Sequence, residues 1–241
     1  MMRDCILVWA PKWVGDVVMA TAAFAALRRG LPEAHLGIVV APRLAPLLEG
    51  SDWFDETILH DPQERGRGAL LPLLRRIRNG GYRTAVLLPY SLRSAWLCWV
   101  AGVPRRIGYA TQGRGLLLTD AVPAPREGGK VRPRYMGTVY TDLLRPLGIE
   151  PGPPAPVLGV TPAQEASARA LLERRGALPG ERFIGLAAGS SFGSSKRWPA
   201  PHFARAGKAL AESLGLRCLI LSAPGEEWVE EEIARWLGKD A

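Results

Sequence analysis

The sequence has only three cysteines in 241 residues, Cys5, Cys98 and Cys218. Each lies in an apolar run, and their spacing fits no metal-ligand motif. This scarcity excludes a disulfide framework and a cysteine-based metal centre. We expect three buried thiols in a protein that is kept in a reducing compartment.

Long apolar runs are also lacking, because none reaches the ~20 residues that a membrane-spanning helix needs. The first residues lead directly into a short strand, without the apolar region and small-residue cleavage site of a secretory signal. We therefore expect a soluble, cytoplasmic protein.

Acidic residues are fewer than basic ones, 23 against 31, so the net charge is +8 and the pI is near 9.9. This balance favours an anionic partner such as a phosphorylated sugar, an anionic lipid or a nucleic acid. Most of the basic residues are arginines, whose planar guanidinium pairs well with phosphate and carboxylate. Neither an RNA-binding aromatic signature nor a helix-turn-helix pattern is present, so we expect no nucleic-acid partner. Surface charges often only hydrate a protein, and charge alone therefore identifies no ligand.

The stretch of residues 6–19 organises the predicted fold. An apolar run is followed by apolar positions at helical spacing, which is typical of a buried strand that turns directly into a helix. Asp16 falls in the first turn of that helix, and in open α/β sheets ligands bind beyond this end of the strands. An acid there can accept a proton from a bound hydroxyl, or it can simply complement the helix dipole.

The rest of the chain, with 47% hydrophobic residues, alternates strand and helix patterns. The predicted strands are 6–9, 35–40, 56–59, 84–89, 106–109, 183–188 and 217–222. The predicted helices are 14–30, 42–49, 69–79, 95–101, 132–147, 162–175, 202–214 and 226–237. Polar loops are expected at 61–68, 110–115 and 121–129, and Ser91 is expected to cap the helix that follows it.

Helix 69–79 combines an apolar side with several arginines. Its apolar side is predicted to consist of Leu70, Leu71, Leu74 and Ile77. A basic amphipathic helix of this kind can rest on a membrane surface. We prefer the interpretation in which the leucines pack on a sheet and the arginines are solvated.

A proline-rich stretch predicts the domain organisation. Residues 149–156 contain four prolines, which stiffen the chain and cannot join a sheet interior. We expect a Rossmann-like domain at 1–150, a linker at 151–160 and a partial second Rossmann-like domain at 161–241.

The loop after the strand at 183–188 is a candidate phosphate site. It begins with Gly189, Ser190 and Ser191 and continues to Lys196. Small residues, hydroxyls and backbone N–H groups at a strand end, followed by a lysine, suit a phosphate. The spacing is neither that of a Walker motif nor that of a dinucleotide-binding G-x-G-x-x-G. An ordinary flexible loop remains the alternative interpretation.

Five stretches resemble, in the same order, the lipopolysaccharide heptosyltransferases of glycosyltransferase family 9. They are residues 13–19, 88–95, 102–109, 134–136 and 192–199. The last reads Phe-Gly-Ser-Ser-Lys-Arg-Trp-Pro and is long enough to be specific. The resemblance implies a GT-B fold, with an acceptor domain followed by a nucleotide-sugar domain. It also implies transfer of heptose, with inversion, from ADP-L-glycero-D-manno-heptose to the inner core of lipopolysaccharide, without a required metal or other cofactor.

The resemblance also assigns roles to residues. It makes Asp16 the catalytic base and places Lys196, with Gly189, Ser190 and Ser191, on the donor. An inverting transfer needs such a base on the acceptor hydroxyl and positive charge on the departing diphosphate. The residues expected to bind the acceptor, an anionic lipopolysaccharide core, are Lys12, Ser91, Arg93 and Arg106. A peripheral contact with the cytoplasmic face of the inner membrane is compatible with such an acceptor.

The sequence departs from the family in two places, and both limit the activity that we expect. Residues 188–191 read Ala-Gly-Ser-Ser where the family has Pro-Gly-Ala-Glu, and the chain ends at Ala241, before the family's later donor-pocket loops. We therefore expect an incomplete second domain and no detectable heptosyl transfer by residues 1–241 alone. The alternatives are a basic α/β module that binds anionic lipid or glycan without turnover, and a related glycosyltransferase that uses another nucleotide sugar.

Overall fold

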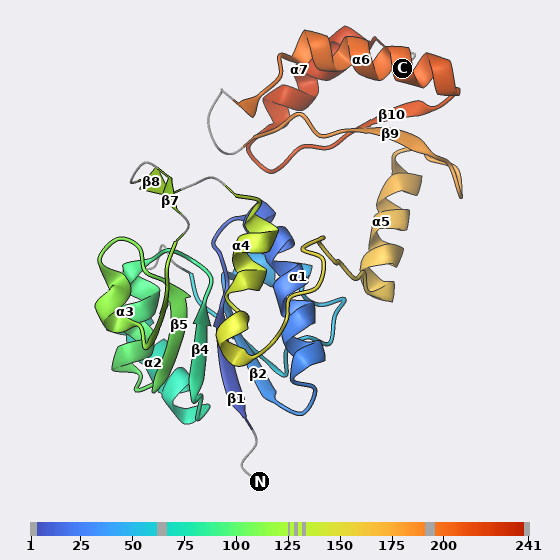
Figure 1. Cartoon of the computed structure of the whole chain (residues 1–241). Helices are drawn as coiled ribbons and strands as arrows, with labels where there is room; N and C mark the ends of the chain where they lie inside the picture. The colour runs from blue at the N-terminus through green and yellow to red at the C-terminus, as the bar shows by residue number, and fades with distance from the viewer. Residues whose placement is uncertain are drawn as a thin grey trace. The chain divides into compact units, whose positions relative to one another are not determined.

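The computed structural model describes residues 4–61, 67–124, 126–127, 130–131, 134–190 and 196–238. The chain forms two compact units, Met1–Glu165 and Ala166–Ala241 (Figure 1). The boundary lies within helix α5 (Pro162–Arg174), so residues 151–160, predicted as a linker, belong to the first unit.

The first unit is built on a six-stranded parallel sheet in the order β3-β2-β1-β4-β5-β6. The strands are β1 (Cys5–Trp9), β2 (His35–Val40), β3 (Glu56–Leu59), β4 (Thr84–Leu87), β5 (Arg105–Tyr109) and β6 (Asp120–Val122). β1 lies centrally, with Val8 paired to Ile38 on one side and to Val86 on the other. The predicted strands 35–40 and 56–59 are confirmed at both ends.

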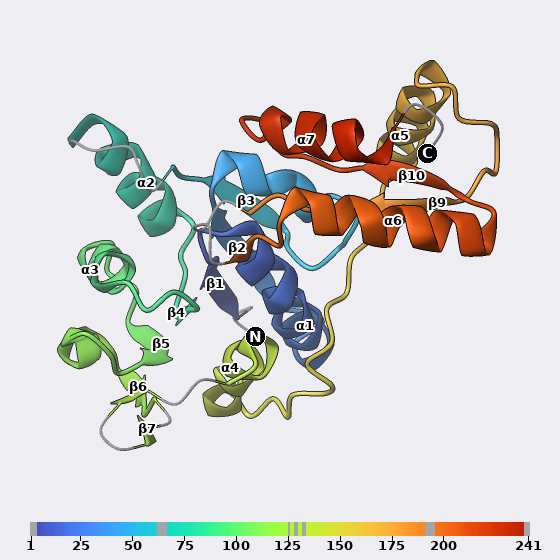
Figure 2. The ribbon, with the colours of Figure 1, turned by 90° about the horizontal axis from the view of Figure 1, so that it is seen from above.

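Helices cover both faces of this sheet, as parallel strands require (Figure 2). On one face α1 (Val14–Gly30) packs with α4 (Met136–Asp142), and on the other lie α2 (Arg67–Asn79) and α3 (Leu92–Val100). Alternate residues of β1 supply the two cores: Ile6 and Val8 face α1 and α4, whereas Leu7 and Trp9 face α2 and α3.

Helix α2 packs on the sheet, as we preferred, but with a different set of side chains. Leu73 and Ile77 are buried, Leu70 and Leu74 are half-buried against them, and Leu71 is 50% exposed. The helical period places Leu71 away from the row formed by Leu73 and Ile77, so its assignment to the packed side was wrong. Of the predicted loop 61–68, residues 62–66 lie outside the described residues and 67–68 already belong to the helix.

Four other predictions need correction. The segment at 42–49 forms a 3₁₀ helix, η1 (Pro42–Leu47). The predicted loop 121–129 contains the end of β6 and the strand β7 (Arg126–Glu127), which pairs antiparallel with β8 (Lys130–Val131). The predicted helix 132–147 is the shorter α4 followed by a 3₁₀ helix, η3 (Arg145–Leu147), because Pro146 cannot continue an α-helix. A third 3₁₀ helix, η2 (Arg114–Leu117), lies partly in the predicted loop 110–115.

The edge strand β6 is held by an ion pair between Arg105 and Asp120, with Nη2 and Oδ1 2.8 Å apart. The hydrogen bond from Arg105 lowers the pKa of Asp120 below its ordinary value. A lowered pKa in the folded state adds stability above the unfolded-state pKa of about 4, and this stability is lost as the pH falls through the folded-state pKa.

We therefore expect Asp120→Asn to lower the free energy of unfolding by about 0.5–1 kcal/mol at pH 7, because the pair is partly exposed. The difference from the wild type should disappear well below pH 4, where the carboxyl is protonated in both states. Urea unfolding at neutral and acidic pH measures both values. A difference that persists at acidic pH would show that Asp120 acts through packing and not through its charge.

The segment 151–160 runs along the first unit without helix or strand. The Val157 N–H donates to Oγ1 of Thr21 in α1 at 2.9 Å. Thr161 caps α5, because its Oγ1 accepts from the Gln164 N–H at 3.1 Å and the Gln164 side chain accepts from the Thr161 N–H.

The second unit contains a parallel pair, β9 (Phe183–Leu186) and β10 (Arg217–Ile220), with α6 (Ala200–Leu214) and α7 (Glu227–Leu237) packed together on it. Its core includes Leu186, Ala204 and Ile233. α6 approaches β9 closely at Gly207, where a Cβ would stand 2.8 Å from Leu186 Cδ1. In the part of the chain that the structure describes, no helix combines the length and apolar character that crossing a membrane requires.

Candidate active site

Asp16 lies at the carboxyl end of the central strand. β1 ends at Trp9, a short turn follows, and α1 begins at Val14 with Asp16 in its first turn. The side chain is partly buried, so it is held by its surroundings and still reachable from solvent. The predicted strand-turn-helix is therefore present, and it puts the acid at the edge of the sheet where ligands bind in this architecture.

A buried tyrosine from α4 orients this carboxylate. The Tyr140 side chain is 3% exposed and its hydroxyl is hydrogen-bonded to Asp16. Burial, reinforced by the negative charge of Asp16, raises the pKa of Tyr140, so the hydroxyl stays protonated and donates the bond. Burial also raises the pKa of Tyr90, a neighbour of Asp16, although Arg114 and Arg134 oppose this shift. An oriented carboxylate with a fixed donor on one side can accept a proton from a substrate hydroxyl on the other.

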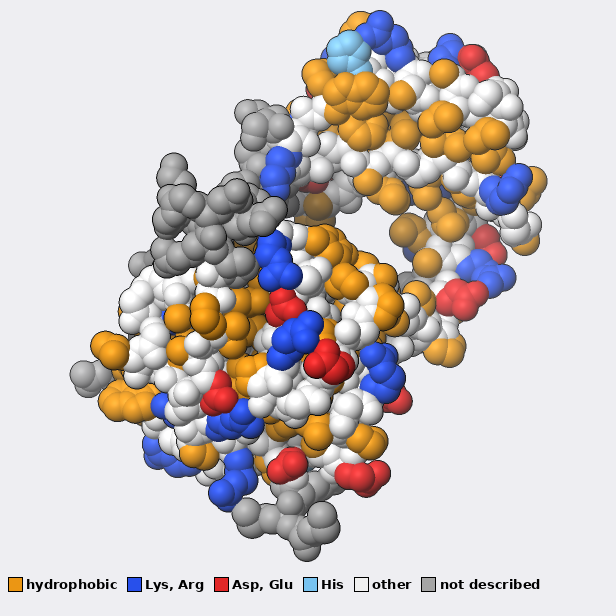
Figure 3. Space-filling model, in the orientation of Figure 1, with side chains coloured by type: hydrophobic (Ala, Val, Ile, Leu, Met, Phe, Trp, Pro, Cys, Tyr) orange, Lys and Arg blue, Asp and Glu red, His pale blue; other side chains and the backbone are white. Residues whose placement is uncertain are grey.

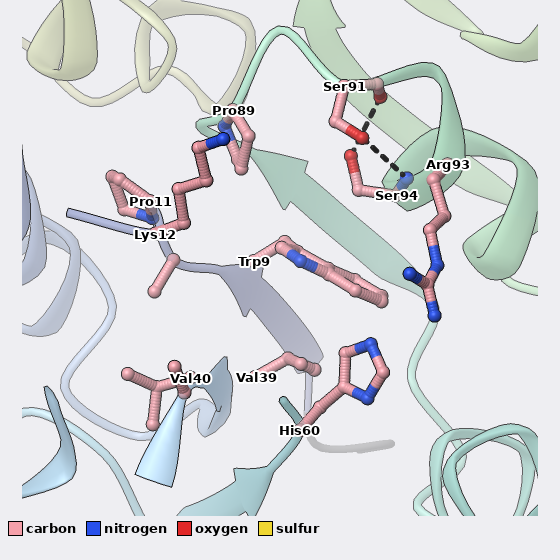
Figure 4. A pocket seen from close by; sticks show the side chains of 12 residues that line it. Trp9, Pro11, Lys12, Val39, Val40, His60, Pro89, Ser91, Arg93 and Ser94 are labelled. Carbon is pink, nitrogen blue, oxygen red and sulfur yellow. Dashed lines mark hydrogen bonds between the residues drawn. The ribbon is translucent and has the colours of Figure 1, made fainter. Parts of the chain in front are cut away.

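A pocket opens at the same edge of the sheet (Figure 4). It is lined by Trp9, Ala10, Pro11, Lys12, Val39, Val40, Ala41, His60, Pro89, Ser91, Arg93 and Ser94. The space is about 530 Å³ including its open mouth, within the range of small-molecule sites. Three of the four residues predicted to bind an acceptor, Lys12, Ser91 and Arg93, are brought together here.

The pocket combines an aromatic floor with cationic walls. Trp9 and His60 meet edge to face, with ring centroids 6.0 Å apart and an interplanar angle of 79°. Lys12 and Arg93 come from opposite sides, with Trp9 between them, and the Arg93 guanidinium points toward His60 and Trp9 (Figure 4). Such an arrangement suits a ring-shaped ligand that carries carboxylate or phosphate groups.

Backbone contacts hold two of these residues. Ser91 caps α3 as predicted, since its Oγ accepts from the Ser94 N–H at 3.4 Å and the Ser94 hydroxyl donates to the Ser91 carbonyl at 2.9 Å. The Lys12 carbonyl accepts from Arg43 Nη2 at 2.7 Å, and the Lys12 ammonium lies 5.1 Å from the Trp13 ring centroid. The turn before α1 is thereby fixed, which positions both Lys12 and Asp16.

Arg106 is not brought to this pocket. It lies near the amino-terminal end of β5, whereas the pocket lies at the carboxyl ends of β1 and β4. Its Nε donates to the Leu117 carbonyl at 2.6 Å, and its Nη1 donates to the carbonyls of Val103 and Pro104. The geometry therefore gives Arg106 a part in holding η2 in place of the predicted acceptor contact.

A fully buried arginine, Arg114, is hydrogen-bonded to the backbone of residues that line the pocket. Its Nε donates to the Tyr109 carbonyl at 2.8 Å, and its Nη1 donates to the carbonyls of Pro89 and Ser91. Burial lowers the pKa of Arg114 to about 10, so it is charged at neutral pH. Among the described residues, its Nη2 has no hydrogen-bond partner.

The sequence-based interpretation missed Trp9, His60, Arg114 and Tyr140. His60 and Trp9 carried a usable signal, since each ends or directly follows a strand on the side where ligands bind. Arg114 and Tyr140 carried no such signal in the sequence, because their roles depend on packing between distant elements.

In the second unit, the predicted donor loop follows β9. Gly189 and Ser190 are partly buried, Lys196 is exposed just before α6, and Ser191 lies outside the described residues. The Glu226 carboxylate packs on Gly189, where a Cβ would stand 1.9 Å from Oε2. Beyond the loop, the Arg197 guanidinium lies 5.1 Å from the Trp228 ring centroid, and Trp198 stacks on His202. The loop therefore begins with a glycine that packs against a carboxylate and ends, in sequence, at an exposed lysine, and these groups suit a sugar hydroxyl and a phosphate.

The described residues include no group of three or more His, Cys, Asp or Glu side chains that could hold a metal ion. The expectation that no metal is required remains a prediction.

The chain is similar in sequence and in fold to known proteins. The profile of glycosyltransferase family 9 (heptosyltransferase) matches residues 70–240. Lipooligosaccharide heptosyltransferase 2 of Haemophilus influenzae is 30% identical over 98% of this chain and 68% of its own length. Lipopolysaccharide heptosyltransferase 2 of Escherichia coli is 30% identical over 86% of this chain and 60% of its own length. The solved structure of E. coli ADP-heptose LPS heptosyltransferase II matches with a TM-score of 0.78 and 26% identity, over 99% of this chain and 70% of that one.

The fold, the site and these similarities define an α/β glycosyltransferase of the GT-B type. The chain spans between 60% and 70% of the lengths of the three proteins compared. It belongs to glycosyltransferase family 9, the heptosyltransferase family. The resemblance seen in five short stretches of sequence is thereby confirmed.

Proposed function

We propose that this chain serves the transfer of heptose, with inversion, from ADP-L-glycero-D-manno-heptose to the inner core of lipopolysaccharide. The observation that carries the proposal is the carboxylate of Asp16, oriented by Tyr140 at the same sheet edge as a cationic, aromatic-floored pocket. Relatives that bear the name lipopolysaccharide heptosyltransferase 2 support the donor and the acceptor.

The proposed chemistry assigns a step to residues of each unit. The acceptor hydroxyl gives its proton to Asp16 as its oxygen forms a bond to the anomeric carbon of the heptose. The bond between that carbon and the phosphate oxygen breaks, and ADP departs with the electron pair. Lys196 neutralises the diphosphate, and Gly189, Ser190 and Ser191 surround it. Lys12, Ser91 and Arg93 bind the acidic acceptor.

The remaining expectations belong to this proposal. Transfer needs no metal, since the lysine supplies the positive charge that a cation would bring to the leaving group. The acceptor is anchored in a lipid, so the protein works in the cytoplasm with a peripheral contact at the inner membrane.

The donor half of the proposal is tested by ADP binding. Lys196→Ala should weaken ADP affinity by about 1.5–3 kcal/mol, the range for hydrogen bonds to charged groups. Titration calorimetry on the wild type and the variant measures the difference. Lys208→Ala is a matched control, because Lys208 is equally exposed and lies within α6, away from the loop.

Equal ADP affinity in the wild type and Lys196→Ala would remove Lys196 from the donor site. Transfer itself is followed by ADP release from ADP-heptose in the presence of a lipopolysaccharide core. Residues 1–241 and a chain extended downstream are compared in this assay. Binding of the core with no ADP release by either would favour the alternative of a module that holds an anionic glycan without turnover.

A further inference from the structure

Helix α3 presents an apolar face to solvent. Leu92, Trp96 and Trp99 follow one another at helical spacing and are 50%, 42% and 54% exposed. The other side of the helix, including Leu97 and Cys98, is fully buried in the core beneath it. The helix is therefore apolar on both sides, which is unusual for a surface helix of a globular protein.

Neighbouring elements extend this face. Leu116 of η2, which packs beside α3, is 97% exposed. On α2, Leu71, Arg75 and Arg78 form one exposed stripe. The Arg78 guanidinium donates to the Val100 carbonyl at 3.0 Å, which places this stripe beside α3. Arg76 points elsewhere, into an ion pair with Glu56 at 2.8 Å.

We call these exposed side chains of α2, α3 and η2 the tryptophan face. Figure 3 shows hydrophobic and basic side chains next to one another on the left-hand flank of the first unit, where Figure 1 draws α2 and α3. The face joins tryptophans with arginines, the two residue types that anchor proteins in the interfacial layer of a membrane.

The charge of the surrounding sequence indicates which kind of partner the tryptophan face binds. From Arg67 to Thr119 the chain has nine arginines and not one aspartate or glutamate, although the whole protein has 23 acidic residues. All three elements of the tryptophan face fall in this segment. Two copies of the chain meeting at this face would bring like charges together, whereas an anionic lipid surface offers the opposite charge.

The same helix connects this face with the pocket. Ser91, Arg93 and Ser94, at the start of α3, line the pocket, while Trp96 and Trp99 lie one and two turns further on. A glycan that is anchored in a bilayer would emerge beside its binding site if α3 rested on that bilayer.

We infer that the tryptophan face docks on an anionic phospholipid surface, with Trp96, Trp99 and Leu116 in the interfacial layer and Arg75 and Arg78 at the headgroups. The inference rests on the membrane contact in the proposed function and deepens it by naming the surface that makes this contact. Docking needs neither donor nor acceptor, so a failure to bind vesicles is distinct from a failure to bind or release ADP.

Co-sedimentation with vesicles of phosphatidylcholine, with or without phosphatidylglycerol, tests the inference. The wild type should sediment with the phosphatidylglycerol vesicles only, and less so at high salt. The double variants Trp96→Ser/Trp99→Ser and Arg75→Gln/Arg78→Gln should each lower the partition coefficient by about tenfold or more. Trp236→Ser is the matched control, because Trp236 is 58% exposed on α7 and lies outside the face. Circular dichroism confirms that each variant is folded.

Three results would overturn the inference. The wild type could stay in the supernatant with phosphatidylglycerol vesicles, or both double variants could sediment as the wild type does. In the third case, sedimentation velocity finds a wild-type dimer that Trp96→Ser/Trp99→Ser converts to a monomer, while vesicle binding stays unchanged. The face would then be an interface between two copies.

Discussion

Asp16→Asn should lower turnover by about 10²–10⁴-fold in a preparation that shows heptosyl transfer, because an amide cannot accept the proton of the acceptor hydroxyl. The change is nearly isosteric, and the amide oxygen can still accept the hydrogen bond from Tyr140. Thermal stability should therefore stay close to that of the wild type. ADP release at saturating donor and acceptor measures the loss.

The control for this experiment is Asp52→Asn, which neutralises an exposed aspartate of the same unit outside the pocket. Its turnover should match the wild type. Near-normal turnover in Asp16→Asn would instead assign Asp16 to the helix dipole of α1, where a first-turn acid contributes only to stability.

Arg114→Met should lower the free energy of unfolding by about 2–3 kcal/mol, because the carbonyls of Pro89, Ser91 and Tyr109 all lose the charged donor that joins them. An opposing effect exists, since burial makes the charged guanidinium costly, as its lowered pKa shows. The loss outweighs that gain, because the Pro89 carbonyl is left without this donor while the carbonyls of Ser91 and Tyr109 keep only their bonds from the Ser94 hydroxyl and the Thr111 N–H.

Urea unfolding followed by circular dichroism measures this loss. Arg83→Met provides the control, because Arg83 is exposed, and we expect a change within about 0.5 kcal/mol there. A variant Arg114→Met as stable as the wild type would mean that solvent or another donor replaces Arg114 at the Pro89 carbonyl.

Most of the first unit could be predicted from sequence, for a definable reason. Strands such as 35–40 are continuous apolar runs because both faces of the sheet are covered, and runs of this kind are conspicuous. The strand β6 has only three residues at the sheet edge and depends on the pairing of Arg105 with Asp120. Its signal lies in a contact between elements, which local periodicity does not record.

The residues of the candidate site also differ in whether they could be predicted from the sequence. Lys12, Ser91 and Arg93 follow strands β1 and β4 and so reach the edge where ligands bind, although their prediction did not use this position. Arg106 was chosen for its charge alone, and its place near the start of β5 already pointed to the opposite edge. Arg114 could not be foreseen, because an arginine is expected at the surface and this one is 0% exposed.

The alternation of side chains along β1 has an evolutionary consequence. Val8 belongs to the layer of α1 and α4, which holds Asp16 and Tyr140, whereas Trp9 belongs to the layer of α2 and α3, which supplies Arg93. Selection can therefore act on the two layers separately. Under the proposed function, mutations on the α3 side would change the part of acceptor recognition that Ser91 and Arg93 carry, while Asp16 and Tyr140, together with Lys12 in the turn before α1, are inherited unchanged. A single strand thus lets descendants of one ancestor diverge in what they recognise without losing the reaction that they perform.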